Sequence, residues 1–446
     1  MKWLVLGASG TLMAGVIQLA REWGDDVIGI DDHFLPPIGP QLTQMGIELI
    51  QGYPDSLPFK PDGVIVGNAI KRGNPTMEWV LNQRIPYYSA PEWLGARLRD
   101  YDSIIAICGT HGKTSTAAML TWVLQQADLN PGYLVAGVMN GFEKLASKGL
   151  GKTFVIEADE YDSAFFDKRP KCLHYRPTHL LINNLDYDHA DIYPDLESIQ
   201  QQMRWMIRTV PGDGLIVVPH GDSHVSAVID PCWTRIQSFG QRDLGLEAVK
   251  SAQGFDVYQS HALVGQVEWD LVGNQWMHNA LAAITLAVSI GVETQDATHY
   301  LSTYPGVARR RQLKGVIGGV AYWDDFAHHP TAITKMLESF PSKGRLIAVF
   351  NPVNFTQRKG LMQAELVRSL SIADQVVMIK PLPYKPEDWL GFVQSITKPF
   401  HWVDTLDDLS AFLDGGVQEG DTVVLMGASH YDNFFSQVFS KGVHNE

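Results

Sequence analysis

Residues 104–116 read Ile-Ile-Ala-Ile-Cys-Gly-Thr-His-Gly-Lys-Thr-Ser-Thr, an apolar strand that runs into a glycine-rich loop and then a helix. Gly109 and Gly112 allow the backbone to turn successive N–H groups toward phosphate oxygens. Lys113 supplies a positive charge for the β- and γ-phosphates, and Thr114 supplies a hydroxyl for a bound Mg²⁺. The helix that follows points the positive end of its dipole at the same anion. The stretch therefore predicts a binding site for ATP or GTP.

Length and composition restrict the class of protein. A chain of 446 residues is too long for a single core, so we expect two to four domains. The net charge of −14 argues against a nucleic-acid partner, and no apolar run is long enough to predict a membrane span. The three cysteines form no CxxC pair, which is typical of a protein from a reducing compartment. We therefore expect a cytoplasmic enzyme.

The alternation of predicted strands and helices divides the chain into three α/β blocks, at residues 1–100, 101–305 and 306–446. In the first block, strands at 2–6, 26–30 and 63–66 are separated by helices. This β-α-β order is typical of a parallel sheet with ligand loops at the ends of its strands. The expected fold class is α/β, with a Rossmann-like first domain, a central P-loop parallel sheet and a Rossmann-like C-terminal domain.

Acidic and amide side chains follow two apolar strands of the central block. Glu157, Asp159 and Glu160 come after the strand at 153–156, and a run of Asn and Asp residues with His189 follows the strand at 180–182. Oxygen ligands at the carboxyl ends of such strands are well placed to hold Mg²⁺ next to a phosphate loop. A solvated acidic surface is the alternative for Asp159 and Glu160.

Three motifs taken together resemble the Mur ligases of peptidoglycan synthesis: Gly-Thr-His-Gly-Lys-Thr (109–114), Glu-Ala-Asp-Glu (157–160) and Asp-His (188–189). In the third block, residues 306–311 and 324–330 are similar to the signature of the muramate-ligating branch. The resemblance implies an ATP- and Mg²⁺-dependent ligase that forms an amide through an acyl phosphate. It also implies a first domain for UDP-muramate, a central domain for ATP and a C-terminal domain for the peptide.

The resemblance also assigns residues to the site. The implied metal ligands are Thr114, Glu157 and His189, and the implied catalytic residues are Lys113, His111, Glu157 and His189. Arg310 and Asp325 are expected to reach the nucleotide, with Arg311 as a rival to Arg310. The full set of expected nucleotide contacts is Gly109, Thr110, His111, Gly112, Lys113, Thr114, Ser115, Asn279, Arg310 and Asp325.

The first block carries a partial dinucleotide-binding pattern. Gly7 and Gly10 follow a strand, but Ser9 and Leu12 stand where that pattern needs glycine. A turn that places a UDP diphosphate on a helix N-terminus relies on the same physics, and the resemblance favours UDP. The candidate substrate contacts are Gly10, Thr11, Asp31 and Asn68. The alternative is that Asp31 and Asn68 only cap turns.

The acceptor separates two branches of the family. Residues 157–169, 183–193, 67–75 and 46–53 are most similar to the branch that joins UDP-N-acetylmuramate to L-Ala-γ-D-Glu-meso-diaminopimelate. The alternative branch adds L-alanine. Gln275, Trp276 and Val353 depart from the usual family motifs, so the acceptor stays open. The expected partners are therefore UDP-N-acetylmuramate and a short murein peptide, with no nucleic acid and no membrane.

Three other classes share part of the pattern. A folylpolyglutamate-type synthetase has the same loop, but the His-His-Pro motif at 328–330 and the UDP-type first domain argue against it. A GTPase switch would need Asn-Lys-x-Asp, which the sequence does not contain. A nicotinamide-dependent dehydrogenase would have no use for the loop at 109–114.

Overall fold

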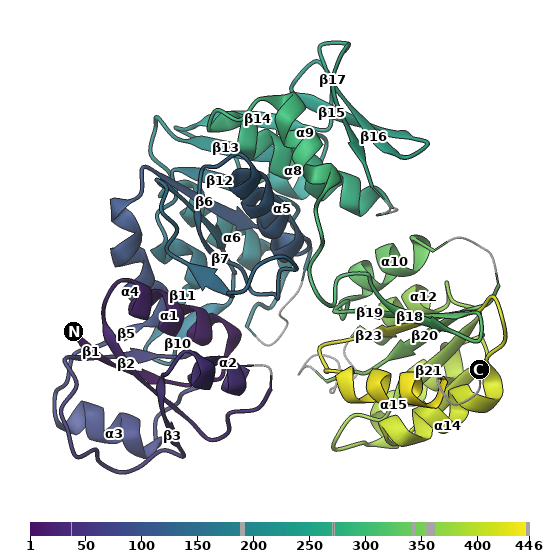
Figure 1. Cartoon of the computed structure of the whole chain (residues 1–446), viewed down its shortest axis with the longest axis horizontal. Helices are drawn as coiled ribbons and strands as arrows, with labels where there is room; N and C mark the ends of the chain where they lie inside the picture. Colours follow the sequence, from purple (N-terminus) through teal and green to yellow (C-terminus); the bar gives the residue numbers. More distant parts are fainter. Residues whose placement is uncertain are drawn as a thin grey trace. The chain divides into compact units, whose positions relative to one another are not determined.

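The computed structural model describes residues 1–36, 38–187, 192–269, 271, 273–340, 344–353 and 362–442. Figure 1 shows the chain coloured along its sequence. The chain divides into two compact units, the first running to Pro305 and the second starting at Gly306, except that Leu271–Trp276 also belongs to the second. None of the helices in these described segments combines the length and apolarity needed to cross a bilayer.

The first unit begins with a five-stranded parallel sheet in the order β3-β2-β1-β4-β5. Asn74 and Ser89 cap the N-termini of two of its helices with their side chains, and a proline in the first turn of each adds a preset helical φ. The elements are β1 (Lys2–Leu6), α1 (Thr11–Glu22), β2 (Asp26–Asp31), α2 (Ile38–Gln44), β3 (Glu48–Gln51), β4 (Gly63–Val66), α3 (Pro75–Asn82), β5 (Tyr87–Ser89), α4 (Ala90–Arg97) and η1 (Leu98–Asp100).

The central sheet of the same unit has seven strands in the order β14-β13-β12-β6-β9-β7-β8, and only the pair β7–β8 is antiparallel. Its middle strands are buried apart from the first residue of β6, of β9 and of β12, as expected for a parallel sheet covered by helices on both faces. The strands are β6 (Ser103–Cys108), β7 (Gly132–Leu134), β8 (Ala146–Ser147), β9 (Thr153–Glu157), β12 (His179–Ile182), β13 (Leu215–Pro219) and β14 (Arg235–Phe239).

The remaining elements of this unit surround the central sheet. A hairpin of β10 and β11 follows β9, and a three-stranded antiparallel sheet has the order β15-β16-β17. These elements are α5 (Lys113–Gln126), β10 (Asp162–Ala164), β11 (Asp167–Pro170), η2 (Lys171–His174), α6 (Leu196–Ile207), α7 (Ser223–Ser226), β15 (Leu246–Ser251), β16 (Gly254–Gln259), β17 (Ala262–Glu268), α8 (Asn274–Ser289) and α9 (Thr294–Ser302).

The second unit is built on a six-stranded sheet in the order β18-β19-β23-β20-β21-β22, in which β18 pairs antiparallel and the other strands are parallel. Two apolar clusters fill its two faces. The elements are β18 (Gln312–Ile317), β19 (Val320–Asp325), α10 (Pro330–Glu338), β20 (Leu346–Phe350), α12 (Gln363–Leu370), β21 (Gln375–Ile379), η3 (Pro386–Trp389), α13 (Leu390–Ser395), β22 (Phe400–Val403), α14 (Leu406–Gly416), β23 (Thr422–Met426) and α15 (Asp432–Gly442).

Candidate functional site

The glycine-rich loop leaves the end of β6, between β12 and β9, and leads into α5. Gly109 has a φ of +132°, and a Cβ there would lie 3.0 Å from the backbone oxygen of Asn184. Gly112 has a φ of +83°, and a Cβ there would lie 2.5 Å from Oδ1 of Asn279. Backbone conformation and crowding therefore both require glycine at these two positions.

Lys113 is the first residue of α5. Its Nζ donates to the backbone carbonyl of Gly109 at 2.8 Å and to the Glu160 carboxylate oxygens at 3.1 and 2.9 Å. Burial lowers the pKa of Lys113, but the charges of Glu160 and Asp159 outweigh this effect and raise it overall. The ammonium group is therefore charged, and it reaches back to the first residue of the loop.

Thr114 and Glu157, two of the predicted metal ligands, lie next to each other. The Thr114 hydroxyl donates to Oε2 of Glu157 at 3.2 Å, and the backbone N–H of Ala136 donates to Oε1 at 2.8 Å. Glu157 is the last residue of β9, which pairs with β6, so adjacent strand ends bring the two side chains together. Hard oxygen donors of this kind suit Mg²⁺.

The third predicted metal ligand, His189, lies outside the described residues. Within the segments that the structure does describe, no three His, Cys, Asp or Glu side chains form a group that could hold a metal ion. Thr114 and Glu157 lie together, and the metal-ligand roles of Thr114, Glu157 and His189 all stay predictions.

The residues that follow β12 hold the other side of the loop. The backbone N–H of His111 donates to Oδ1 of Asn184 at 2.8 Å, and Nε2 of His111 lies 3.5 Å from Oδ2 of Asp186. The hydroxyl of Thr110 donates to the backbone carbonyl of Asp186 at 3.1 Å. His111 is thus oriented by the chain segment that carries the predicted metal-binding histidine.

Asn279 approaches the loop from α8. Its Oδ1 accepts a hydrogen bond from Nδ2 of Asn183 at 3.0 Å, beside Gly112. Nε2 of His278 lies 3.2 Å from the backbone oxygen of Asn183. The helix therefore places an amide against the phosphate loop although it departs from the usual family motif at Gln275 and Trp276.

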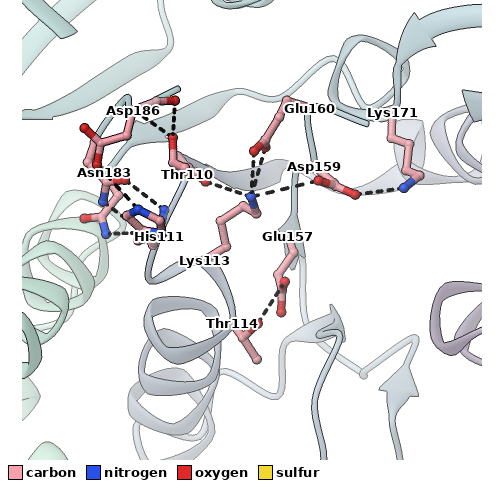
Figure 2. Close-up of polar contacts among 12 residues, drawn as sticks. Thr110, His111, Lys113, Thr114, Glu157, Asp159, Glu160, Lys171, Asn183 and Asp186 are labelled. Carbon is pink, nitrogen blue, oxygen red and sulfur yellow. Dashed lines mark hydrogen bonds and ion pairs between the residues drawn. The ribbon is translucent and has the colours of Figure 1, made fainter. Parts of the chain in front are cut away.

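A second lysine, which the sequence did not single out, belongs to this group of charges. Nζ of Lys171 lies 2.8 Å from Oδ2 of Asp159, and Oδ1 of Asp159 lies 3.9 Å from Nζ of Lys113. Figure 2 shows the resulting row of alternating charges, which runs from Glu160 through Lys113 and Asp159 to Lys171. Lys171 lies beyond the acidic motif, at the start of η2, and no spacing rule pointed to it.

The predicted substrate residues of the first block gather at the carboxyl ends of β1, β2 and β4. Gly10 is the N-cap of α1, and Thr11 is the first residue of that helix. Asp31 ends β2, and its Oδ2 accepts from the backbone N–H of Ser9 at 2.8 Å, so it does cap the turn. Asn68 follows β4 and donates through Nδ2 to Oδ1 of Asp162 at 2.8 Å. Their contact with a UDP-sugar stays a prediction.

Arg310 and Asp325 lie in the second unit. The Arg310 guanidinium lies 4.9 Å from the Phe326 ring, and burial raises the pKa of Asp325 while the charge of Arg310 opposes that rise. Arg311, the rival candidate, is buried and donates to the Ser339 hydroxyl at 3.1 Å. Arg311 is therefore hydrogen-bonded within the second unit, and its role as the rival to Arg310 stays a prediction. The nucleotide contacts of Arg310 and Asp325 stay predictions.

Comparison with known proteins assigns this chain to a family. Three models match in succession: "Mur ligase family, catalytic domain" over residues 5–102, "Mur ligase middle domain" over 107–287, and "Mur ligase, glutamate ligase domain" over 309–429. The chain belongs to the Mur ligase family. Members of this family are ATP-dependent enzymes that form amide bonds. The predicted resemblance and the three-domain α/β class are thereby confirmed, while the domain boundaries proposed from the sequence stay predictions.

Individual Mur ligases differ in their similarity to this chain. The UDP-N-acetylmuramate–L-alanyl-γ-D-glutamyl-meso-2,6-diaminoheptandioate ligase of Escherichia coli K12 is 41% identical over 95% of this chain and 94% of its own. The crystal structure of a murein peptide ligase from Psychrobacter arcticus 273-4 is 33% identical, with a TM-score of 0.78 over 100% of this chain and 99% of that one. The UDP-N-acetylmuramate–L-alanine ligase of Caldicellulosiruptor bescii is 27% identical over 99% of each chain.

Proposed function

We propose that this Mur ligase joins UDP-N-acetylmuramate to the tripeptide L-Ala-γ-D-Glu-meso-diaminopimelate, with ATP as the energy source and Mg²⁺ as the metal. The observation that carries the proposal is the 41% identity, over nearly the whole of both chains, to a relative named for that reaction. The alternative acceptor, L-alanine, is named for relatives that are 27% identical. We also infer a cytoplasmic site of action, which fits the three free cysteines in the described residues.

The chemistry needs a good leaving group on the muramate carboxyl. The carboxylate attacks the γ-phosphorus of ATP in line, which breaks the bond to the β-phosphate, releases ADP and gives an acyl phosphate. The amine of the peptide then attacks the acyl carbon, loses a proton and displaces phosphate. Lys113, the first residue of α5, would orient the β- and γ-phosphates together with the N–H groups at the N-terminus of that helix. Thr114 and Glu157 would hold Mg²⁺, which supplies charge neutralisation on the phosphate oxygens.

The test is ADP release by the purified chain with UDP-N-acetylmuramate, ATP and Mg²⁺, comparing the tripeptide with free L-alanine. Stimulation by the tripeptide alone supports the proposal. Stimulation by L-alanine would assign the chain to the alternative reaction, and no stimulation by either acceptor would refute both. Lys113→Ala should abolish turnover, whereas Lys152→Ala, an exposed lysine just before β9, should retain it.

A further inference from the structure

The hairpin of β10 and β11 leaves the central sheet and packs on the first sheet (Figure 1). At its turn, Phe165 and Phe166 contact the apolar cluster under that sheet, and Phe166 lies edge-on to Tyr87 with ring centroids 4.9 Å apart. After the hairpin, the carbonyl of His174, at the end of η2, lies so close to α4 that a Cβ on Gly95 would approach it to 2.1 Å. The turn of the hairpin and the η2 helix that follows it therefore both contact the first block.

Asp162, the first residue of β10, links the hairpin to Asn68, one of the candidate substrate contacts. Its Oδ1 accepts from Nδ2 of Asn68 at 2.8 Å, and its Oδ2 lies 2.6 Å from Nζ of Lys168 on the opposite strand. Asp162 is buried, whereas 69% of the Lys168 side chain is exposed. One buried carboxylate thus holds an amide of the first sheet and a solvent-facing ammonium of the hairpin side by side.

The place of this pair is set by the first sheet. Asn68 follows β4, which pairs with β1, and the turn after β1 is so close that a Cβ on Gly7 would lie 3.8 Å from Cα of Gly67. Lys168 therefore stands at the same edge as the N-terminus of α1, where the carboxyl ends of parallel strands present ligand loops. Residues 157–162 therefore connect two sites: Glu157 contacts Thr114 next to the glycine-rich loop, and Asp162 contacts Asn68 after β4.

We propose that Lys168 binds an anionic group of the sugar nucleotide, and that Asp162 is a positioning residue that holds Lys168 and Asn68 for it. This inference rests on the proposed function. UDP-N-acetylmuramate carries two such groups, the diphosphate and the lactyl carboxylate. An ammonium that bonds to either group adds a charge-assisted hydrogen bond. Because the pairing with Asp162 limits the rotamers of Lys168, less conformational entropy is lost when the ligand binds.

The test is calorimetric titration, without ATP, of the wild-type chain, Lys168→Met and Asp162→Asn. UDP-N-acetylmuramate, UDP-N-acetylglucosamine and UDP serve as ligands. Lys168→Met should weaken binding of UDP-N-acetylmuramate about tenfold, which is the loss of one charge-assisted contact. It should also flatten the dependence of the dissociation constant on ionic strength. Asp162→Asn should weaken binding in the same direction, and Lys152→Met, the removal of another exposed lysine, should leave it unchanged.

The three ligands separate the two anionic groups. Loss confined to UDP-N-acetylmuramate assigns Lys168 to the lactyl carboxylate, and equal loss for all three assigns it to the diphosphate. Wild-type affinity of Lys168→Met for all three ligands would overturn this inference alone. Failure of the wild-type chain to bind UDP-N-acetylmuramate would instead refute the proposed function. A melting curve of each variant checks folding, which the exposure of Lys168 should preserve.

Discussion

The ion pair between Lys113 and Glu160 predicts that one substitution weakens the fold and strengthens nucleotide binding. In the structure, Glu160 takes two of the three donors of the Lys113 ammonium, and the Gly109 carbonyl takes the third. The side chains of Lys113 and Glu160 are only 15% and 4% exposed. A triphosphate can therefore reach Lys113 only if the ammonium leaves Glu160.

The expected sizes follow from this geometry. The attraction between two unit charges at the distance of the Lys113 ammonium and the Glu160 carboxylate is on the order of 4 kcal/mol at an effective dielectric constant of about 20. Because both groups lose their hydration, the net contribution of such a charge-assisted hydrogen bond is about 1.5–3 kcal/mol. Glu160→Gln keeps an acceptor but removes the charge. We therefore expect the free energy of unfolding of the empty protein to fall by about 2 kcal/mol. The affinity for ATP should rise about tenfold, because less attraction has to be broken.

The assay is calorimetric titration of ATP in the presence of EDTA, so that metal ligation does not contribute, together with thermal melts of the empty protein. ADP should show the same gain, and adenosine, which has no phosphate, should show none. Asp159→Asn is the matched control, because Asp159 lies 3.9 Å from Lys113 and its other oxygen is held by Lys171. A folded Glu160→Gln protein that binds ATP no more tightly than the wild type would refute the reasoning.

Three more predictions concern single side chains. Gly112→Ala should lower the free energy of unfolding by about 1–3 kcal/mol and abolish ATP binding. Gly24 has a φ of +86° and nothing within 4 Å of the position that a Cβ would take, so Gly24→Ala should lower the free energy of unfolding only by the backbone strain. Denaturant titration of both variants measures the difference between these two losses. Thr114→Val should raise the Mg²⁺ concentration for half-maximal ADP release about tenfold, and Thr121→Val, which removes a buried hydroxyl on the same helix, should not. Burial raises the pKa of Asp324 to about 6 against the opposing charge of Arg309. The native state therefore binds an extra proton between the unfolded and folded pKa values, and stability falls as the pH rises from about 4 to 6, by up to about 3 kcal/mol. Asp324→Asn should lack this fall in pH-dependent unfolding, and an unchanged pH profile would contradict the assignment.

The glycine-rich loop shows which features of the structure can be predicted from neighbouring residues alone. Gly109, Gly112 and Lys113 were predicted as one unit because glycine conformation and helix start are local properties of the chain. The same holds for β1 and β4, whose bounds agree with the ranges 2–6 and 63–66 expected from the sequence. The sequence could also predict that Thr114 and Glu157 lie close together, because they stand at the ends of neighbouring strands of one parallel sheet.

Contacts between distant segments were decided by tertiary structure alone. Lys171 pairs with Asp159, and Asp162 links Asn68 to Lys168, because the hairpin folds back onto the first sheet. Arg310 and its rival Arg311 are neighbours in the sequence. Only packing sends Arg311 to Ser339 and leaves Arg310 over Phe326. The sequence by itself determined the phosphate loop, its strand and its helix, since their geometry depends on neighbouring residues. The structure decided which charge meets which, since that depends on how the chain brings remote strand ends to one edge.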